Sequence, residues 1–290
     1  MPLRMPALAT LALVAFAANS LLCRAALAHT AIDAATFTTV RLLSGAIVLG
    51  LVAWRHASRT PRAPNATRAR MRGGDWWSAA ALFAYALGFS FAYVQLPAAA
   101  GALLLFGAVQ ATMIGWGLWQ GERLRALQAV GLVLAGAGLV GLLLPGLSAP
   151  PLAGASLMVA AGIGWGIYSL RGRRAADPLR ATAGNFLRAV PMALLASVLF
   201  ARTGAFDAAG IGYAIASGTL ASGAGYAIWY AVLPSLKATS AATVQLCVPV
   251  IAAAGGVLLL GEPLTLRLVA ASIAILGGIA LVVMRRDAGT

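Results

Sequence analysis

The chain has 290 residues, of which 61% are hydrophobic and 10% are charged, and its mean hydropathy is +0.89. A water-soluble domain cannot bury so much apolar surface, so this composition excludes a soluble globular protein and predicts one surrounded by lipid. The net charge of +14 would suit a nucleic-acid partner, but the distribution of the basic residues, described below, argues against one.

Ten apolar runs are long enough to cross a bilayer as helices, since a spanning helix needs about 20 apolar residues. The chain is therefore predicted to be an all-α integral membrane protein with ten transmembrane helices. The first run follows Arg4, as in a signal peptide, but its length of about 22 residues favours a spanning helix. In chain order the runs cover residues 6–27, 34–54, 76–96, 98–120, 126–144, 152–170, 181–201, 208–232, 239–260 and 268–284.

Basic residues set the orientation of these helices. With a cytoplasmic N-terminus, Arg202 and Arg267 are the basic residues left on the outer side, and Arg24, Arg41 and Arg188 fall within spans. Because Lys and Arg favour cytoplasmic connections, both termini are predicted to lie in the cytoplasm, with anionic lipid headgroups as the contact of the excess charge. The basic residues on the cytoplasmic side are Arg4, Arg55, Arg59, Arg62, Arg68, Arg70, Arg72, Arg123, Arg125, Arg171, Arg173, Arg174, Arg180, Lys237, Arg285 and Arg286.

The chain also contains an internal repeat. Gly121–Leu144 and Gly261–Met284 each consist of a Gly-Glu turn followed by an apolar span rich in small residues. Residues 1–145 and 146–290 are predicted to be two repeats of five helices. Because five is odd, the second repeat enters the membrane from the opposite side, which is the inverted-topology architecture of many secondary transporters.

Single residues match between the halves in a consistent order. Arg24 corresponds to Arg173, and Tyr93 corresponds to Tyr230. We expect the glutamate of the second turn, Glu262, to cap the helix that follows it, because first-turn amides favour a negative charge.

Several of these features together resemble one known family. Ten spans in a 5+5 inverted repeat, Arg41 and Arg188 in the second span of each half, and the turns GERL and GEPLT resemble the drug/metabolite transporter superfamily of EamA type. The stretch Trp165–Ser169 (WGIYS) and the aromatic third span resemble its bacterial aromatic amino acid exporter branch. The resemblance implies a multi-pass protein of the bacterial inner membrane that exports small metabolites by alternating access through a central cavity.

Aromatic residues mark three of the spans. Tyr85 and Phe89 lie one turn apart in the third span, Trp165 and Tyr168 lie in the sixth, and Tyr226 lies in the eighth. Aromatic faces can stack on the ring of a ligand, so these residues are candidates for lining a substrate cavity. The alternative is that they only pack helices against each other.

Amides within spans are a second set of candidates. Asn19, Gln110 and Gln245 cannot face lipid without leaving polar groups unsatisfied, so we expect them to point inward. There they either hold the ammonium and carboxylate groups of a zwitterion or form hydrogen bonds between helices.

Arg41 and Arg188 are costly within a membrane, at about 2.5–3.5 kcal/mol for a central arginine on insertion scales. Each is therefore expected to have a role, which is either a structural one, such as capping a helix end, or the pairing of a substrate carboxylate.

The acidic residues all lie at the ends of spans or between them, so the sequence has no intramembrane carboxylate of the kind that relays protons. It also lacks a nucleotide-binding motif, and no His, Asp or Cys residues converge within spans. We therefore expect no cofactor, no metal and no enzymatic activity.

The predicted function is export of small amphipathic metabolites, above all amino acids including aromatic ones. The alternatives are a broad-specificity drug or metabolite efflux carrier of the same fold and, with less support, an intramembrane enzyme or a channel. The substrate list, the choice between uniport and proton antiport, and the oligomeric state stay open at this point; a monomer is compatible with the sequence.

Overall fold

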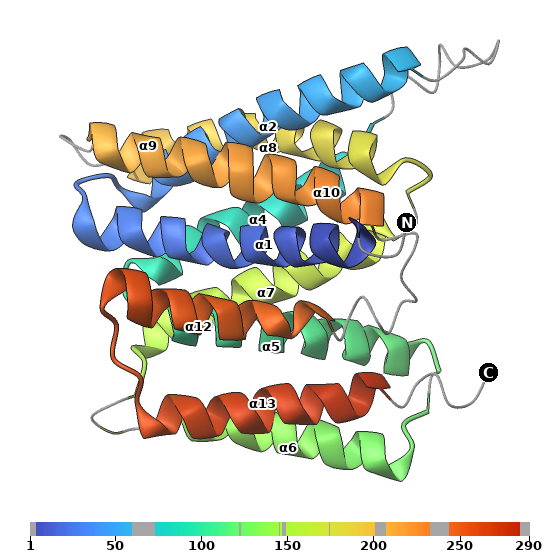
Figure 1. Cartoon of the computed structure of the whole chain (residues 1–290), viewed down its shortest axis with the longest axis vertical. Coiled ribbons are helices and arrows are strands. Elements are labelled where there is room, and N and C mark those ends of the chain that lie inside the picture. The colour runs from blue at the N-terminus through green and yellow to red at the C-terminus, as the bar shows by residue number, and fades with distance from the viewer. Residues whose placement is uncertain are drawn as a thin grey trace.

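The computed structural model describes residues 4–59, 73–121, 123–144, 146, 149–173, 175–200, 207–232 and 244–284, and every regular element among them is a helix. The all-α prediction is thus confirmed, and the helices lie side by side in one bundle (Figure 1). The helices are α1 (Arg4–His29), α2 (Ala34–Arg59), α4 (Trp76–Tyr93), α5 (Ala98–Trp119), α6 (Ala126–Leu143), α7 (Leu152–Gly172), α8 (Pro178–Phe200), α9 (Ala208–Ala216), η1 (Ser217–Ala224), α10 (Gly225–Val232), α12 (Cys247–Leu260) and α13 (Leu266–Met284).

Each predicted span coincides with helical structure. By length and composition alone, α1, α2, α5, α6, α7 and α8 could each cross a membrane, and α12 and α13 are shorter apolar helices. The eighth span is one helical run, residues 208–232, in which the π-helical segment η1 separates α9 from α10. π-helical turns are rare and are frequently found at functional sites. Of the ninth span, residues 239–243 lie outside the described residues.

The contacts between helices are the same when each helix is replaced by the corresponding helix of the other half. α6 packs on α13, and α2 packs on α8, so the fifth and second helices of each half meet their own counterparts. α4 packs on α7, and in the matching arrangement α1 packs on α9, η1 and α10. Duplicated halves would produce this pattern. The boundary between the repeats near residue 145 stays a prediction.

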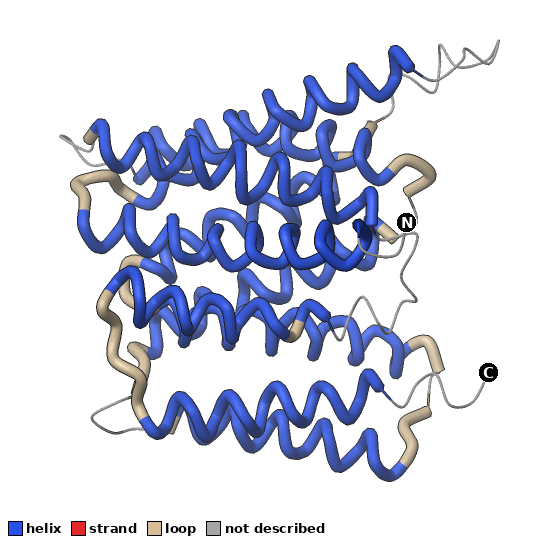
Figure 2. Tube along the Cα trace, viewed as in Figure 1, coloured by secondary structure: helices blue, strands red, loops and turns tan. Residues whose placement is uncertain are grey.

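The connections lie where an inverted repeat would place them. The connection from α5 to α6 and the connection from α12 to α13 lie at opposite ends of the bundle (Figure 2). α1 begins and α13 ends at the same end, as Figure 1 shows. The side of the membrane to which each end belongs stays a prediction from the charge distribution.

Glycines allow α6 and α13 to approach closely at one edge of the bundle. A Cβ atom added to Gly131 would lie 2.5 Å from the carbonyl oxygen of Gly278, so no larger residue fits there. Gly138 also faces α13, whereas Gly136 has no neighbouring atom within 4 Å of such a Cβ. Small residues at such contacts are the usual way in which helices associate in lipid.

Candidate functional site

The centre of the bundle contains a cavity of about 380 Å³. It is lined by α1, α4, α5, α7, η1 and α10 and by Gln245, which precedes α12. All eight residues predicted to line a cavity contribute to it: Asn19, Tyr85, Phe89, Gln110, Trp165, Tyr168, Tyr226 and Gln245. Sequence reasoning missed the lining residue Phe16 of α1, although Phe16 corresponds to Trp165 in the predicted repeat.

The aromatic residues form one contiguous cluster around Trp165. The Trp165 ring lies 4.8 Å from Tyr85, 5.3 Å from Tyr168 and 5.4 Å from Tyr226, measured between ring centroids. Phe89 extends the cluster, because its ring lies 5.4 Å from Tyr85. Such rings offer a flat apolar surface on which another ring can stack.

The amides of the cavity fall into two groups. Asn19 donates from Nδ2 to the Tyr85 hydroxyl at 3.1 Å and accepts at Oδ1 from Ser217 of η1 at 2.7 Å, so it holds three helices together. Gln110 and Gln245 also line the cavity, but no described residue forms a hydrogen bond with either side-chain amide. These two amides are therefore available to a bound molecule.

Hydroxyl groups form a short chain near one end of the cavity. The Tyr168 hydroxyl donates to Thr182 Oγ1 at 3.2 Å, and Thr182 donates to the Tyr230 hydroxyl at 3.2 Å. Arg173 and Pro178, at the junction of α7 and α8, complete the lining there. Because the Arg173 side chain is exposed, the cavity reaches the surface at this end.

The two arginines of the second spans differ sharply. Arg188 donates from Nη1 to the carbonyl oxygens of Gly73 and Gly184, so it has a structural role that ties α8 to the chain before α4. Arg41 is fully buried, and its Nε and Nη1 atoms have no hydrogen-bond partner among the described residues. Its guanidinium lies 5.2 Å from the Tyr85 ring centroid and 5.0 Å from that of Phe89.

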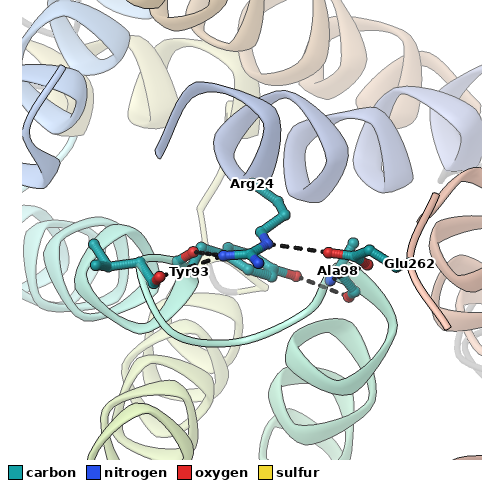
Figure 3. Close-up of polar contacts among 5 residues, drawn as sticks. Arg24, Tyr93, Ala98 and Glu262 are labelled. Carbon is teal, nitrogen blue, oxygen red and sulfur yellow. Dashed lines mark hydrogen bonds and ion pairs between the residues drawn. The ribbon is translucent and has the colours of Figure 1, made fainter. Parts of the chain in front are cut away.

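The expectation that Glu262 caps the following helix is wrong. Its Oε2 atom accepts a hydrogen bond from the backbone amide of Ala98, the first residue of α5, at 2.8 Å. Its Oε1 atom lies 3.0 Å from Nε of Arg24 (Figure 3). The first-turn amides of any helix can bind a carboxylate. Here α5 supplies the amide that Glu262 binds, whereas the Leu268 amide in the first turn of α13 donates to Thr265. The intramembrane Arg24 and the matched Gly-Glu turns were the sequence signals for this contact.

An ion pair joins α4 and α7 at the open end of the cavity. Asp75 caps α4 by accepting from the Ser78 amide at 2.9 Å, and Nη2 of Arg171 lies 2.8 Å from Oδ1 of Asp75. Partial burial opposes ionisation of this carboxyl, but the bonds from Ser78 and Arg171 outweigh it and hold the pKa of Asp75 below its usual value.

This chain is similar to one protein family, to a bacterial relative and to a solved structure. The model of the EamA-like transporter family matches residues 152–284. The uncharacterized protein PA1977 of Pseudomonas aeruginosa is 56% identical over 279 residues, which are 96% of this chain and 94% of that protein. A solved crystal structure superposes with a TM-score of 0.64 at 20% identity, over 95% of this chain and 98% of the other, which supports the fold.

Proposed function

We propose, from the premise that this chain belongs to the EamA-like transporter family, that it exports amino acids and similar amphipathic carboxylates. The family is one of membrane transporters, so a small-molecule substrate follows from membership. The proposal that the substrate is an amino acid or a similar carboxylate rests on the chemistry of the cavity. We further propose that the two ends of the cavity open in turn, with the exposed Arg173 end on the cytoplasmic side.

The observation that carries the proposal is an aromatic cavity with two amides that no described residue engages. Its volume of about 380 Å³ falls within the range of small-molecule sites, which is roughly 300–1,000 Å³. Trp165 and its neighbours would stack on an apolar or aromatic side chain. Gln110 and Gln245 would donate to a carboxylate and accept from an ammonium group.

Charge narrows the class of substrate. Arg173 is the one charged residue among the described residues that line the cavity, and the unpaired Arg41 lies directly behind Tyr85 and Phe89. Two unit charges about 8 Å apart interact with an energy of about 2 kcal/mol when the effective dielectric constant is about 20. A carboxylate in the cavity would be attracted to Arg41 with an energy of this order. The cavity therefore favours a carboxylate and disfavours an organic cation. This balance speaks against the alternative of a broad carrier for cationic drugs.

Energy coupling follows from the same lining. No carboxylate lies among the described lining residues, so the cavity has no acid to carry a proton as access alternates. We therefore propose that substrate moves down its own gradient.

The test is counterflow of labelled L-phenylalanine in liposomes that contain the purified protein. We expect saturable exchange at equal pH on both sides, with 3-phenylpropanoate competing and phenethylamine competing more weakly by at least about thirtyfold, because its positive charge is repelled where a carboxylate is attracted. Equal competition by the amine would contradict the proposed charge preference. Absence of exchange for every amino acid would contradict the proposed substrate class.

A further inference from the structure

One end of the bundle is held together by a compact polar network, which we call the closed-end cluster: Arg24, Tyr93, Val94, Ala98 and Glu262 (Figure 3). Arg24 pairs with Glu262 at 3.0 Å and donates from Nη1 to the carbonyl oxygens of Tyr93 at 3.0 Å and Val94 at 3.3 Å. The cluster thus joins three segments: α1, the connection from α4 to α5, and the turn before α13.

Each partner in the cluster has more than one bond. Glu262 pairs with Arg24 through one oxygen and binds the Ala98 amide through the other. The Tyr93 hydroxyl donates to the Ala98 carbonyl at 3.3 Å. Separating the segments would therefore leave a carboxylate, a guanidinium and two backbone carbonyls without their partners in a partly buried place, and each such loss is costly unless water enters.

The cluster lies one helical turn beyond the floor of the cavity. Ser20 of α1 and Phe89 of α4 are lining residues, and Arg24 and Tyr93 follow them four positions later, on the same helix faces. The Phe89 and Tyr93 rings contact edge to face at 4.7 Å, and Tyr93 is fully buried. The cavity therefore ends below the cluster, whereas its opposite end reaches the exposed Arg173.

The two predicted repeats both contribute to the cluster. Arg24, Tyr93 and Ala98 belong to the first half of the chain, and Glu262 belongs to the second. A rearrangement that opens the cavity at this end must move these halves relative to each other, because the cluster spans the line between them.

We propose that the closed-end cluster is the latch of this end of the cavity, and that breaking the Arg24–Glu262 pair is the step that opens it. Release would free the first amide of α5 and the carbonyl groups at the end of α4, and it would expose the rings of Phe89 and Tyr93 to water. The proposal concerns the conformational step and does not depend on which substrate is carried.

A native cysteine reports on this step. Cys23 is adjacent to Arg24 and fully buried, whereas Cys247 is exposed. With Cys247 replaced by serine, the labelling rate of Cys23 by a polar maleimide measures how often the latch opens. Because both faces of the protein are accessible in lipid nanodiscs, the measurement needs no assumption about membrane sidedness.

The expected results follow from the donors and acceptors. Arg24→Gln and Glu262→Gln should each raise the labelling rate of Cys23 by about tenfold, as the loss of one charge-assisted hydrogen bond predicts. Arg24→Lys keeps the charge but cannot reach all three acceptors at once, so it should give an intermediate rate. Arg123→Gln, which replaces an exposed arginine in the connection between α5 and α6, is the control and should leave the rate unchanged.

A charge exchange separates a network from a simple ion pair. In the double variant Arg24→Glu, Glu262→Arg, the acid at position 24 cannot donate to the Tyr93 and Val94 carbonyls, and the base at position 262 cannot accept from Ala98. We therefore expect fast labelling, with no rescue. If Arg24→Gln and Glu262→Gln are labelled at the same rate as the parent, the proposal is overturned. Rescue by the exchange would support the latch and would show that the ion pair alone holds it. If a glutamine variant fails to fold, the order of rates for Arg24→Lys and the parent decides the question.

Discussion

Each end of the cavity has an arginine, and the surroundings of the two arginines differ. Arg24 at the closed end pairs with Glu262 and with two backbone carbonyls, whereas Arg173 at the open end is exposed and no described residue bonds its side chain. The two positions correspond to each other in the predicted repeat. The sequence thus provides the same side chain at both ends, and the fold engages it at one of them. A carrier that opens its ends in turn requires this difference in any single state.

Arg41 and Arg188, the arginines of the second spans, can be compared in the same way. Replacing Arg41 is expected to have the largest effect of the substitutions described here. Arg41→Gln should remove about a tenfold to thirtyfold preference for 3-phenylpropanoate over its neutral amide, since one unit charge is lost near the cavity. Because that charge is buried without a hydrogen-bond partner, the variant should unfold at the same or a higher temperature.

Arg188→Gln is the matched control, with the reverse pattern. It breaks two bonds to backbone carbonyls, so it should lower stability by up to about 3 kcal/mol and leave the preference for carboxylates intact. Competition in liposomes and thermal unfolding in detergent measure the two effects. A loss of stability without a change of preference in Arg41→Gln would assign Arg41 a structural role as well.

A second comparison concerns Trp165 and Phe16, two aromatic residues at corresponding positions of the predicted repeats. Trp165→Ala should weaken transport of aromatic amino acids by about tenfold relative to alanine or serine, because a lost stacking partner costs about 0.5–1.5 kcal/mol beyond lost contact area. Phe16→Ala should have a smaller effect, since Phe16 contacts two rings at 5.6 and 5.9 Å and Trp165 contacts three at shorter distances.

Trp119→Ala removes an exposed tryptophan of α5. It should change neither the transport rate of aromatic amino acids nor that of alanine or serine. An equal loss for large and small substrates in Trp165→Ala would mean that Trp165 packs helices and does not stack on substrate. Initial rates of uptake for each labelled amino acid decide between these outcomes.

The smallest effect is expected at the open end, from Asp75 and Arg171. A carboxyl whose pKa is lowered in the folded state stabilises it above the unfolded pKa of about 3.9, and this contribution is lost as the pH falls through the folded pKa. The difference in unfolding temperature between the parent and Asp75→Asn should therefore stay constant from pH 5 to 8 and narrow below about pH 4. A difference that narrows between pH 8 and 6 would contradict the lowered pKa.

Much of the fold could be predicted from the sequence, because apolar runs reflect the lipid environment directly. The positions of Tyr85, Phe89, Trp165 and Gln245 at one cavity followed from helical spacing and from the cost of polar groups in lipid. The roles of Arg41 and Arg188 could not be separated by sequence, since their difference lies in neighbours on other helices.

Glu262 shows why contacts between distant parts of the chain could not be predicted from the sequence. The rule that an acid favours a helix N-terminus was sound, but two helix N-termini compete for this carboxylate and local sequence names only the following one. The bonds to Ala98 and Arg24 join residues 164 and 238 positions apart in the chain. Contacts at such separations depend on how the two halves assemble.

The central claim is that the cavity opens at one end as it closes at the other, and distances across both ends test it most directly. Spin labels at Val94 and Leu264 span the closed end, and labels at Leu11 and Ala176 span the open end, in a background with both cysteines replaced; Val94, Leu264, Leu11 and Ala176 are all exposed. Pulsed electron resonance in nanodiscs, with and without L-phenylalanine, gives the distribution of each distance. We expect substrate to produce a population with a longer distance across the closed end and a population with a shorter distance across the open end. The two populations should be the same fraction of the molecules. Distances that stay fixed, or that lengthen together at both ends, would contradict it.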